Sequence, residues 1–297
     1  MKFNHKPLNL YVNFKESAEK FPKSRFIFDK KLNAFPELEL ETNYQSVHEA
    51  VLQKAYNLSA LGIKKEDKVI IFKSSAFDTY LLAVAVSYLG AVPAMISHHF
   101  STPVMDTLAA RLETPWLIFD EDTDAVVQEL KNVNEDHKLF VSDFASITNS
   151  PEVSNQQLAT DEIAYLTHTS GTTGIPKLIA HSAQSMGWRW VLQRTVMDWM
   201  PDKSSLLAFH ISPVHSRFNI GISSAMTFGF DLMPLSNLEK NTVLSMFEKY
   251  RPTAFETHPN HFVRLANVVK ETPEAFASIR YLHSTFDAIN KDTMHTF

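Results

Sequence analysis

A short segment rich in hydroxyl groups and glycine carries the strongest chemical signal in this sequence. It runs from Tyr165 to Lys177 and reads YLTHTSGTTGIPK. Hydroxyl residues and two of the chain's 7 glycines crowd its centre: Thr167, Thr169, Ser170, Gly171, Thr172, Thr173 and Gly174. Glycine lets backbone N–H groups approach a ligand closely, and hydroxyl groups donate to phosphate oxygens or contact Mg2+. Because Pro176 also stiffens the exit and Lys177 adds a positive charge, the segment predicts a loop that binds a polyphosphate.

The spacing within this segment separates it from two better-known catalytic loops. The common nucleotide-binding loop has four residues between its glycines and a lysine directly after the second. Here two residues separate Gly171 from Gly174, and Lys177 comes three positions later. The Gly-x-Ser-x-Gly turn of serine hydrolases is also absent from the sequence. The remaining alternative to a phosphate loop is a flexible surface loop of similar composition.

Alternating helices and strands are expected to position this loop. Apolar residues at helical spacing from Tyr44 to Leu61, followed by Gly62, predict the first helix. Short apolar runs predict buried strands, and the segments between them predict further helices. The expected strands are 69–72, 92–96, 116–119, 139–141 and 163–167, and the other expected helices are 77–89, 104–112 and 126–130. This repetition predicts an α/β fold with parallel-rich sheets flanked by helices.

Composition excludes several classes of protein. The 297 residues are 44% hydrophobic, 21% charged and 11% aromatic, which is typical of a globular chain and not of a disordered or coiled-coil one. The formal net charge of −5 and the lack of a long basic run argue against nucleic-acid binding. The chain has no cysteine, which rules out disulfides, thiolate metal sites and a cysteine nucleophile.

One long uncharged stretch could be mistaken for a membrane span. No charged residue occurs from Thr79 to Met105, but Gly90 and Pro93 interrupt the stretch. We therefore expect a buried helix, a turn and a buried strand, and no integral membrane segment. The first 20 residues lack the apolar core of a secretory signal, and we expect a cytoplasmic protein.

The segment from Tyr165 to Lys177 resembles the signature loop of the adenylate-forming superfamily, which comprises acyl-CoA synthetases, luciferases and the adenylation domains of peptide synthetases. That signature is close to Tyr-Thr-Ser-Gly-Thr-Thr-Gly-x-Pro-Lys-Gly, and Leu178 stands here in place of the final glycine. Other family segments are matched in the same order by Thr42–Tyr44, Glu66–Val69, Tyr88–Pro93, Asp161–Tyr165, Pro213–His215 and Lys249–Thr253. The resemblance covers about residues 40 to 290.

The resemblance implies the N-terminal large domain of such an enzyme. The first α/β subdomain would span residues 1–200 and include the loop at 165–177. Residues 201–297 would begin a second α/β subdomain that lines the acyl pocket. The family's C-terminal lid domain has no counterpart in this sequence, so we expect an incomplete N-terminal portion that binds nucleotide weakly and turns over poorly alone.

The reaction that the resemblance implies is the ATP-dependent activation of a small carboxylic acid as an acyl-adenylate, with Mg2+. The acyl group would then pass to coenzyme A or to the phosphopantetheine of an acyl carrier protein. A fatty or aryl acid is favoured over an amino acid, because the first acidic residue after Asp202 is Asp231, too late to bind an α-ammonium group. The alternative is a non-catalytic nucleotide- or acyl-binding module, or a subunit completed in trans.

The resemblance also assigns roles to single residues. Lys177 and His215 would be catalytic, although His215 could equally be a core histidine. The phosphates would be held by Thr169, Ser170, Gly171, Thr172, Thr173 and Gly174, with Thr173 also contacting Mg2+. The segment beneath adenine would be Thr285, Phe286 and Asp287, where Phe286 either stacks on the base or belongs to the core. Arg217 is expected to point to solvent, and the pairs His98–His99 and His258–His261 are expected to bind no metal.

Overall fold

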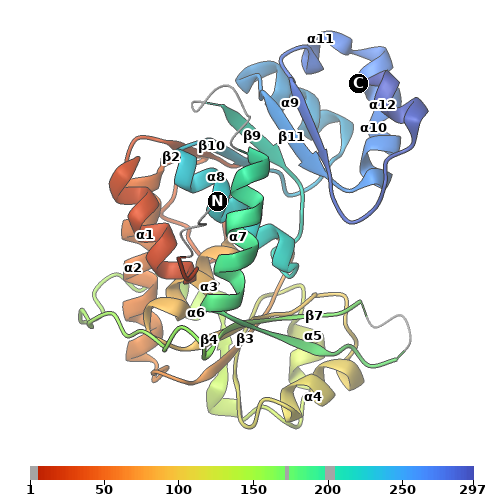
Figure 1. The fold of residues 1–297 in the computed structure, drawn as a ribbon. Helices are drawn as coiled ribbons and strands as arrows, with labels where there is room; N and C mark the ends of the chain where they lie inside the picture. Colours follow the sequence, from red (N-terminus) through yellow and green to blue (C-terminus); the bar gives the residue numbers. More distant parts are fainter. Residues whose placement is uncertain (1–5, 171–173, 198–204) are drawn as a thin grey trace.

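Two six-stranded sheets organise the molecule (Figure 1). The computed structural model describes residues 6–170, 174–197 and 205–297. The sheet that carries the predicted phosphate loop has the order β6-β5-β3-β4-β7-β8. Its strands are β3 (Lys68–Phe72), β4 (Val92–Met95), β5 (Trp116–Phe119), β6 (Lys138–Phe140), β7 (Ile163–His168) and β8 (Leu178–Ser182).

Neighbouring strands of this sheet are parallel except at its edge. There β7 and β8 form an antiparallel pair in which His168 lies opposite Leu178. The predicted phosphate loop is the connection of this hairpin. All the strands predicted from the sequence are present, and the parallel-rich α/β class is confirmed.

The second sheet has the order β12-β11-β9-β10-β1-β2. Four parallel strands come from the later part of the chain: β9 (Leu206–Phe209), β10 (Asp231–Pro234), β11 (Ala254–Thr257) and β12 (Tyr281–Ser284). The other two are the early strands β1 (Arg25–Ile27), which pairs with β10, and β2 (Glu41–Asn43). Strands from residues 25–43 therefore complete the sheet that is formed mainly by residues 206–284. The boundary between two subdomains at residue 200 stays a prediction.

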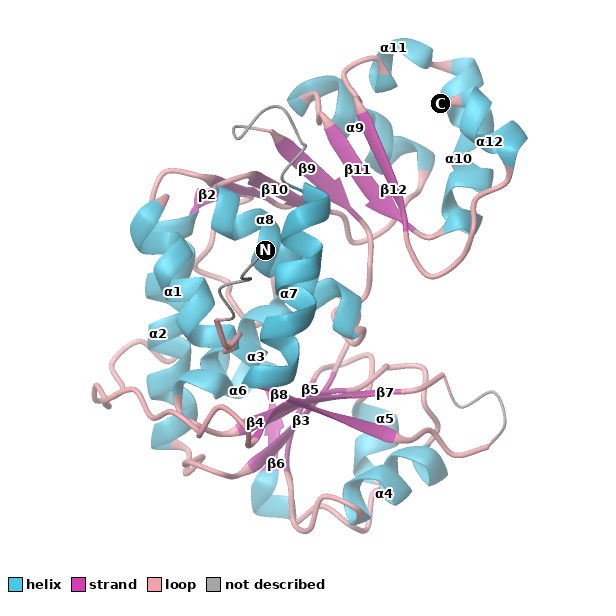
Figure 2. Ribbon diagram, in the orientation of Figure 1, coloured by secondary structure: helices cyan, strands magenta, loops and turns pink. Residues whose placement is uncertain are grey.

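Helices fill the space between the sheets and cover their outer faces (Figure 2). The layer between the sheets contains α1 (Leu10–Lys20), α2 (Tyr44–Ala60), α3 (Asp78–Tyr88), α7 (Ala183–Met197) and α8 (Ser216–Phe228). Beside the first sheet lie α4 (Thr102–Ala110), α5 (Asp124–Gln128) and the short 3-10 helix Glu135–His137. The short helix α6 (Val141–Ala145) packs against α2. Beside the second sheet lie α9 (Lys240–Tyr250), α10 (Pro259–Glu271), α11 (Pro273–Phe276) and α12 (Lys291–Thr296).

Helix α3 accounts for the long uncharged stretch. Every residue from Asp78 to Tyr88 is buried, because other elements surround this helix on all sides. A turn at Gly90, whose φ of 67° favours glycine, leads into the fully buried strand β4. The predicted helix, turn and strand are confirmed. In the part of the chain that the structure describes, no helix is both long and apolar enough to cross a bilayer.

Candidate functional site

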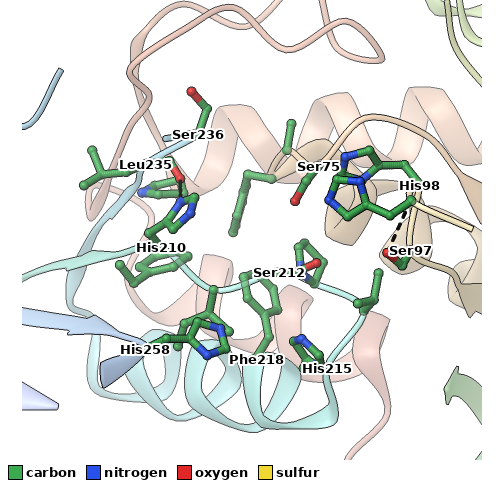
Figure 3. A pocket seen from close by; sticks show the side chains of 18 of the residues that line it. Ser75, Ser97, His98, His210, Ser212, His215, Phe218, Leu235, Ser236 and His258 are labelled. Atoms are coloured by element: carbon green, nitrogen blue, oxygen red, sulfur yellow. Dashed lines mark hydrogen bonds between the residues drawn. The ribbon is translucent and has the colours of Figure 1, made fainter. Parts of the chain in front are cut away.

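A cavity of about 400 Å³ opens where the carboxyl ends of strands from both sheets meet (Figure 3). Such edges are where α/β proteins commonly bind ligands, because the loops after parallel strands converge there. The first sheet contributes Ser75–Phe77 after β3, Ser97–Phe100 after β4, and His168 and Ser170 at the end of β7. The second sheet contributes 209–215 from the end of β9 onward, 234–236 from the end of β10 onward, and His258 and His261 after β11.

The cavity is lined by a mixture of apolar and uncharged polar side chains. Among the described residues that line the cavity, none is Asp, Glu, Lys or Arg. Aromatic and aliphatic side chains, including Phe77, Phe209 and Phe218, form much of the wall. The polar part consists of serines and of the histidines His98, His99, His168, His210, His215, His258 and His261. This arrangement suits a mostly apolar ligand with uncharged polar groups.

The predicted phosphate loop is closed at its base by Thr169 and Lys177. The Thr169 N–H donates to the Lys177 carbonyl at 3.0 Å, and the Lys177 N–H donates to Thr169 Oγ1 at 3.0 Å. Ser170 borders the cavity, which places the start of the loop at its rim. Gly174 has a φ of 144°, a conformation that glycine tolerates. Gly171, Thr172 and Thr173 lie outside the described residues.

The side chain of Lys177 lies apart from the cavity in this structure. It is exposed and lines a separate open groove together with Lys68 and Arg111. Arg111 also fixes the exit of the loop, because its Nη1 donates to the Pro176 carbonyl at 2.9 Å. Of the two residues predicted to be catalytic, the structure therefore brings only His215 to the cavity together with Ser170.

His168 was not singled out by the sequence, yet it links the phosphate loop to the loop after β4. Its Nε2 accepts from the Ser97 N–H at 3.1 Å, and its Nδ1 lies 2.8 Å from the Thr169 carbonyl. The ring also packs edge-on against Phe100, with centroids 4.6 Å apart. Burial lowers the pKa of His168. In the sequence, the only hint of this role is that His168 stands between the apolar strand and the hydroxyl-rich segment.

His215 lies at the N-terminal end of α8, where its ring forms part of the cavity wall. The ring centroid is 4.9 Å from that of Phe286 and 6.1 Å from that of His258. Burial, followed by the neighbouring His258 and His168, lowers the pKa of His215 to about 4. At neutral pH this side chain therefore offers a neutral N–H donor and not a positive charge.

The segment predicted to lie beneath adenine follows β12 at the edge of the cavity. Thr285 is buried, and its N–H donates to the Thr257 carbonyl at 3.2 Å. Phe286 is 56% exposed and stacks on His258 with centroids 4.5 Å apart and planes at 9°, so it is not a core residue. Its φ of 76° lies in the left-handed region, which is uncommon for a residue other than glycine. Asp287 is exposed, and its Oδ1 accepts from the Ala288 N–H at 2.8 Å.

Two buried charge networks flank the cavity without lining it. Lys73, directly after β3, lies 2.8 Å from Asp78 and 3.7 Å from Asp120. On the other side, Arg217 of α8 forms an ion pair with Glu256 of β11 at 2.7 Å. The expectation that Arg217 points to solvent was wrong, because the nearly buried carboxylate of Glu256 draws the guanidinium inward.

No metal site is evident in residues 6–170, 174–197 and 205–297. Within those ranges, no three His, Asp or Glu side chains are arranged to hold a metal ion. The pair His258 and His261 stack edge-to-face, with centroids 5.4 Å apart. Thr173, the predicted Mg2+ contact, belongs to the residues that are not described.

Comparisons with known proteins identify the family. The sequence profile of the family described as AMP-binding enzyme matches residues 14–297. Because this match spans nearly the whole sequence, the chain belongs to the AMP-binding enzyme family.

Individual relatives are distant and longer than this chain. The 3-amino-2-hydroxy-4-methoxybenzoate diazotase of Streptomyces cremeus is 27% identical over 297 residues, which cover 90% of this chain and 54% of that protein. The 2-succinylbenzoate–CoA ligase of Bacillus cereus (strain Q1) is 25% identical over 142 residues, 47% of this chain and 27% of the ligase. The chain thus spans about half the length of the first of these relatives, and the match to the second covers about a quarter of it.

Solved structures share the fold. The chain superposes on a long-chain-fatty-acid–CoA ligase from Archaeoglobus fulgidus with a TM-score of 0.79 at 15% identity, covering 98% of this chain and 60% of the ligase. It also superposes on the N-terminal domain of FACL13 from Mycobacterium tuberculosis with a TM-score of 0.80 at 16% identity, covering 97% of this chain and 72% of that one.

Proposed function

We propose that this protein binds ATP and a carboxylic acid and joins them as an acyl-adenylate. The single observation that carries the proposal is that Ser170, at the start of the phosphate loop, lines the same cavity as the aromatic and uncharged polar side chains. An acid held in that cavity has its carboxylate beside a loop suited to a triphosphate. Membership of the AMP-binding family supports the proposal.

In this reaction a carboxylate oxygen attacks the α-phosphorus of ATP, a new P–O bond forms, and pyrophosphate leaves. The hydroxyl groups and backbone N–H groups of residues 169–174, with Lys177, would hold the β- and γ-phosphates. His215, neutral at pH 7, would donate a hydrogen bond that orients the carboxylate. The described lining offers no carboxylate ligand for Mg2+, so we assign no step to the metal beyond the predicted contact of Thr173.

We propose an aryl acid as the substrate class. The ammonium group of an amino acid would find no anionic partner among the described lining residues. The aromatic walls and the volume of about 400 Å³ match a substituted benzoate better than a long alkyl chain. Relatives named for benzoate derivatives are consistent with this class.

We propose transfer of the acyl group to a thiol, of coenzyme A or of a carrier-protein phosphopantetheine, as the second half-reaction. The relatives named as CoA ligases support this assignment. A non-catalytic binding module, or a subunit completed in trans, remains the alternative; it predicts ATP binding without acyl-adenylate formation by the chain alone.

Diazotisation of an aromatic amine is a second candidate, favoured by the relative that matches 90% of this chain. Nitrite presents an anionic oxygen to the α-phosphorus as a carboxylate does. After pyrophosphate leaves, the amine nitrogen would take the nitrosyl group from AMP, and loss of water would yield the diazonium ion. Pyrophosphate release that requires nitrite, with a diazonium product formed only when an aminobenzoate is also present, would distinguish this reaction from acid adenylation.

Pyrophosphate release from ATP, measured with benzoates, octanoate and phenylalanine, tests the proposed function. We expect turnover with the benzoates, accompanied by transfer of 18O from the labelled acid to AMP. ATP affinity, measured by calorimetry, should fall at least about tenfold in Lys177→Ala, which corresponds to the loss of a charge-assisted contact. Lys68→Ala is the matched control, because Lys68 lines the same groove as Lys177 but lies outside the loop. ATP binding that is indifferent to Lys177, or labelled acid that never passes oxygen to AMP, would contradict the proposal.

A further inference from the structure

His210 and His261 lie side by side in the cavity wall formed by the second sheet. His210 follows β9, His261 is in the first turn of α10, and their ring centroids are 5.1 Å apart. Figure 3 shows His210 and His258 on one side of the cavity and Ser97 and His98 on the other. The proposed reaction uses neither His210 nor His261.

The hydrogen bonds of Thr257 fix which nitrogen of His261 carries the hydrogen. Thr257 Oγ1 lies 3.0 Å from the His210 carbonyl and 2.8 Å from His261 Nδ1. A carbonyl can only accept, so the single hydroxyl hydrogen of Thr257 points to the carbonyl of His210. Nδ1 of His261 must then donate to Thr257 Oγ1, which leaves Nε2 of the neutral ring with a lone pair.

The same reasoning applies to His210. Its Nδ1 lies 2.9 Å from the Leu235 carbonyl, which again can only accept. Nδ1 therefore carries a hydrogen, and in the neutral ring Nε2 is an acceptor. In the part of the chain that the structure describes, neither Nε2 atom has a hydrogen-bonding partner.

Burial and neighbouring positive charge keep His261 in this neutral state. Burial, followed by His210, His258 and Arg264, lowers its pKa to about 4. At neutral pH its free nitrogen therefore accepts a hydrogen bond and cannot donate one. A ligand group that only accepts, such as a methoxy oxygen or a fluorine, would leave this nitrogen unsatisfied.

We propose that His210 and His261 form an acceptor pair that selects an acid bearing a hydrogen-bond donor, a hydroxyl or amino group, on its aromatic ring. The inference rests on the proposed function, because the acid is what brings the group into the cavity. A ligand that covers these partly buried acceptors without offering a donor removes their hydrogen bonds to water, so we expect the affinity to differ about tenfold or more between donor-bearing and acceptor-only acids.

The two rings also border a second hollow of about 310 Å³, which contains Glu239 and Arg264. Water in that hollow is the competing partner for the free nitrogens. If water there satisfied both Nε2 atoms, the protein would not distinguish donor from acceptor substituents on the acid. The two arrangements therefore give opposite results in a binding experiment.

The experiment measures the affinity of the full chain, with ATP present, for benzoates matched in size but not in hydrogen bonding. At each of the three ring positions, the hydroxy and amino acids are compared with the fluoro and methoxy acids by calorimetry. We expect a preference of about tenfold or more for the donor-bearing acids at one position. Equal affinity within each matched set would overturn the inference and leave the proposed function standing. Failure of every acid to bind would overturn both.

Variants assign the preference to the two rings. His261→Phe and His210→Phe should each remove most of the donor preference while the fluorobenzoate still binds. His261→Gln, which keeps an acceptor near the Nε2 position, should restore part of the preference. His295→Phe, on the exposed surface of α12, is the matched control and should leave it unchanged. A preference that survives both phenylalanine variants would contradict the assignment.

Spectroscopy of the unmodified protein keeps the inference testable even if a variant fails to fold. In 15N-histidine-labelled protein at pH 7, the long-range 1H–15N spectrum distinguishes the two neutral tautomers. We expect the His261 ring to show a protonated Nδ1 and an unprotonated Nε2, with Nε2 shifting when a hydroxybenzoate binds. A protonated Nε2 in that ring would contradict the proposed acceptor.

Discussion

His168 satisfies two backbone groups that come from different loops. The Ser97 N–H can only donate and the Thr169 carbonyl can only accept, so the tautomer with hydrogen on Nδ1 meets both at 3.1 Å and 2.8 Å. Burial also lowers the pKa of His168, which keeps the ring neutral and Nε2 free to accept. A protonated ring could no longer accept the hydrogen bond from the Ser97 N–H. One neutral imidazole thus positions the start of the phosphate loop against the rim of the cavity.

Replacing His168 by phenylalanine should therefore weaken nucleotide binding more than acid binding. Loss of one or two net hydrogen bonds predicts an increase of about five- to tenfold in the dissociation constant of ATP. His168→Asn, which keeps a donor near the Nδ1 position, should recover part of the loss. Titration calorimetry with ATP and with a benzoate measures both affinities. Equal weakening of the two ligands would indicate general disruption instead of positioning of the loop.

At the scale of the elements, a buried cation joins the ends of two strands to a helix. Lys73 follows β3, Asp120 follows β5, and Asp78 begins α3; all three side chains are at most 1% exposed. Asp120 also accepts from the Ser74 N–H, and Asp78 accepts from the Ala34 N–H at 3.1 Å. This network holds the backbone before Ser75–Phe77, which line the cavity.

Lys73→Met should destabilise the protein strongly, because it leaves two buried carboxylates without their cation. Removing one partner of a buried ion pair typically costs about 3–5 kcal/mol. The free energy of unfolding from urea titration measures the effect. Lys15→Met is the control, since its exposed pair with Glu19 at 2.7 Å should contribute at most about 0.5 kcal/mol. A similar small loss for both variants would show that the network does not stabilise the fold.

Local sequence pattern was sufficient for elements whose burial is continuous along the chain. The strands from β3 to β7 are apolar runs bounded by turns, and α2, with α3, α4 and α5, was predicted to within a few residues. Strands β1 and β2 were not predicted, since each has only three residues. β1 pairs with β10, about 200 positions away, and β2 joins the sheet only through β1. Pairing of that kind leaves no periodic signal.

The same limit applied to the site. Ser170 and His215 were identified because they belong to a recognisable motif. The roles of His168, His210 and His261 could be assigned only from their hydrogen-bonding partners. These partners are Ser97, Leu235 and Thr257 respectively, and the order of the strands brings them close. A histidine between apolar residues looks the same in the sequence whether its free nitrogen meets a core atom or a ligand.

At the scale of the whole molecule, folding keeps several histidines neutral. The pKa values of His181, His215 and His261 are each lowered to about 4, in every case mainly by burial. In the unfolded chain these rings titrate near pH 6.5. Between pH 6.5 and pH 4 the unfolded state therefore binds more protons than the folded state, and the free energy of unfolding falls as the pH falls.

His181 gives the clearest test of this dependence, because its side chain is 6% exposed and stacks on Tyr165 at 4.7 Å. Lowering the pH from 7 to 5 spans about 1.5 pH units of the window, worth about 2 kcal/mol for one fully buried histidine. His181→Gln keeps a group that can bond Thr167 Oγ1 but does not titrate. Urea titrations at both pH values measure how much the free energy of unfolding falls between pH 7 and pH 5. This fall should be smaller by about 2 kcal/mol in the variant than in the parent protein. His295→Gln, at an exposed position, should lose as much as the parent. Identical losses in all three proteins would mean that His181 takes up its proton between pH 7 and pH 5 in the folded state just as it does in the unfolded state, so that folding does not lower its pKa, against the direction that its burial predicts.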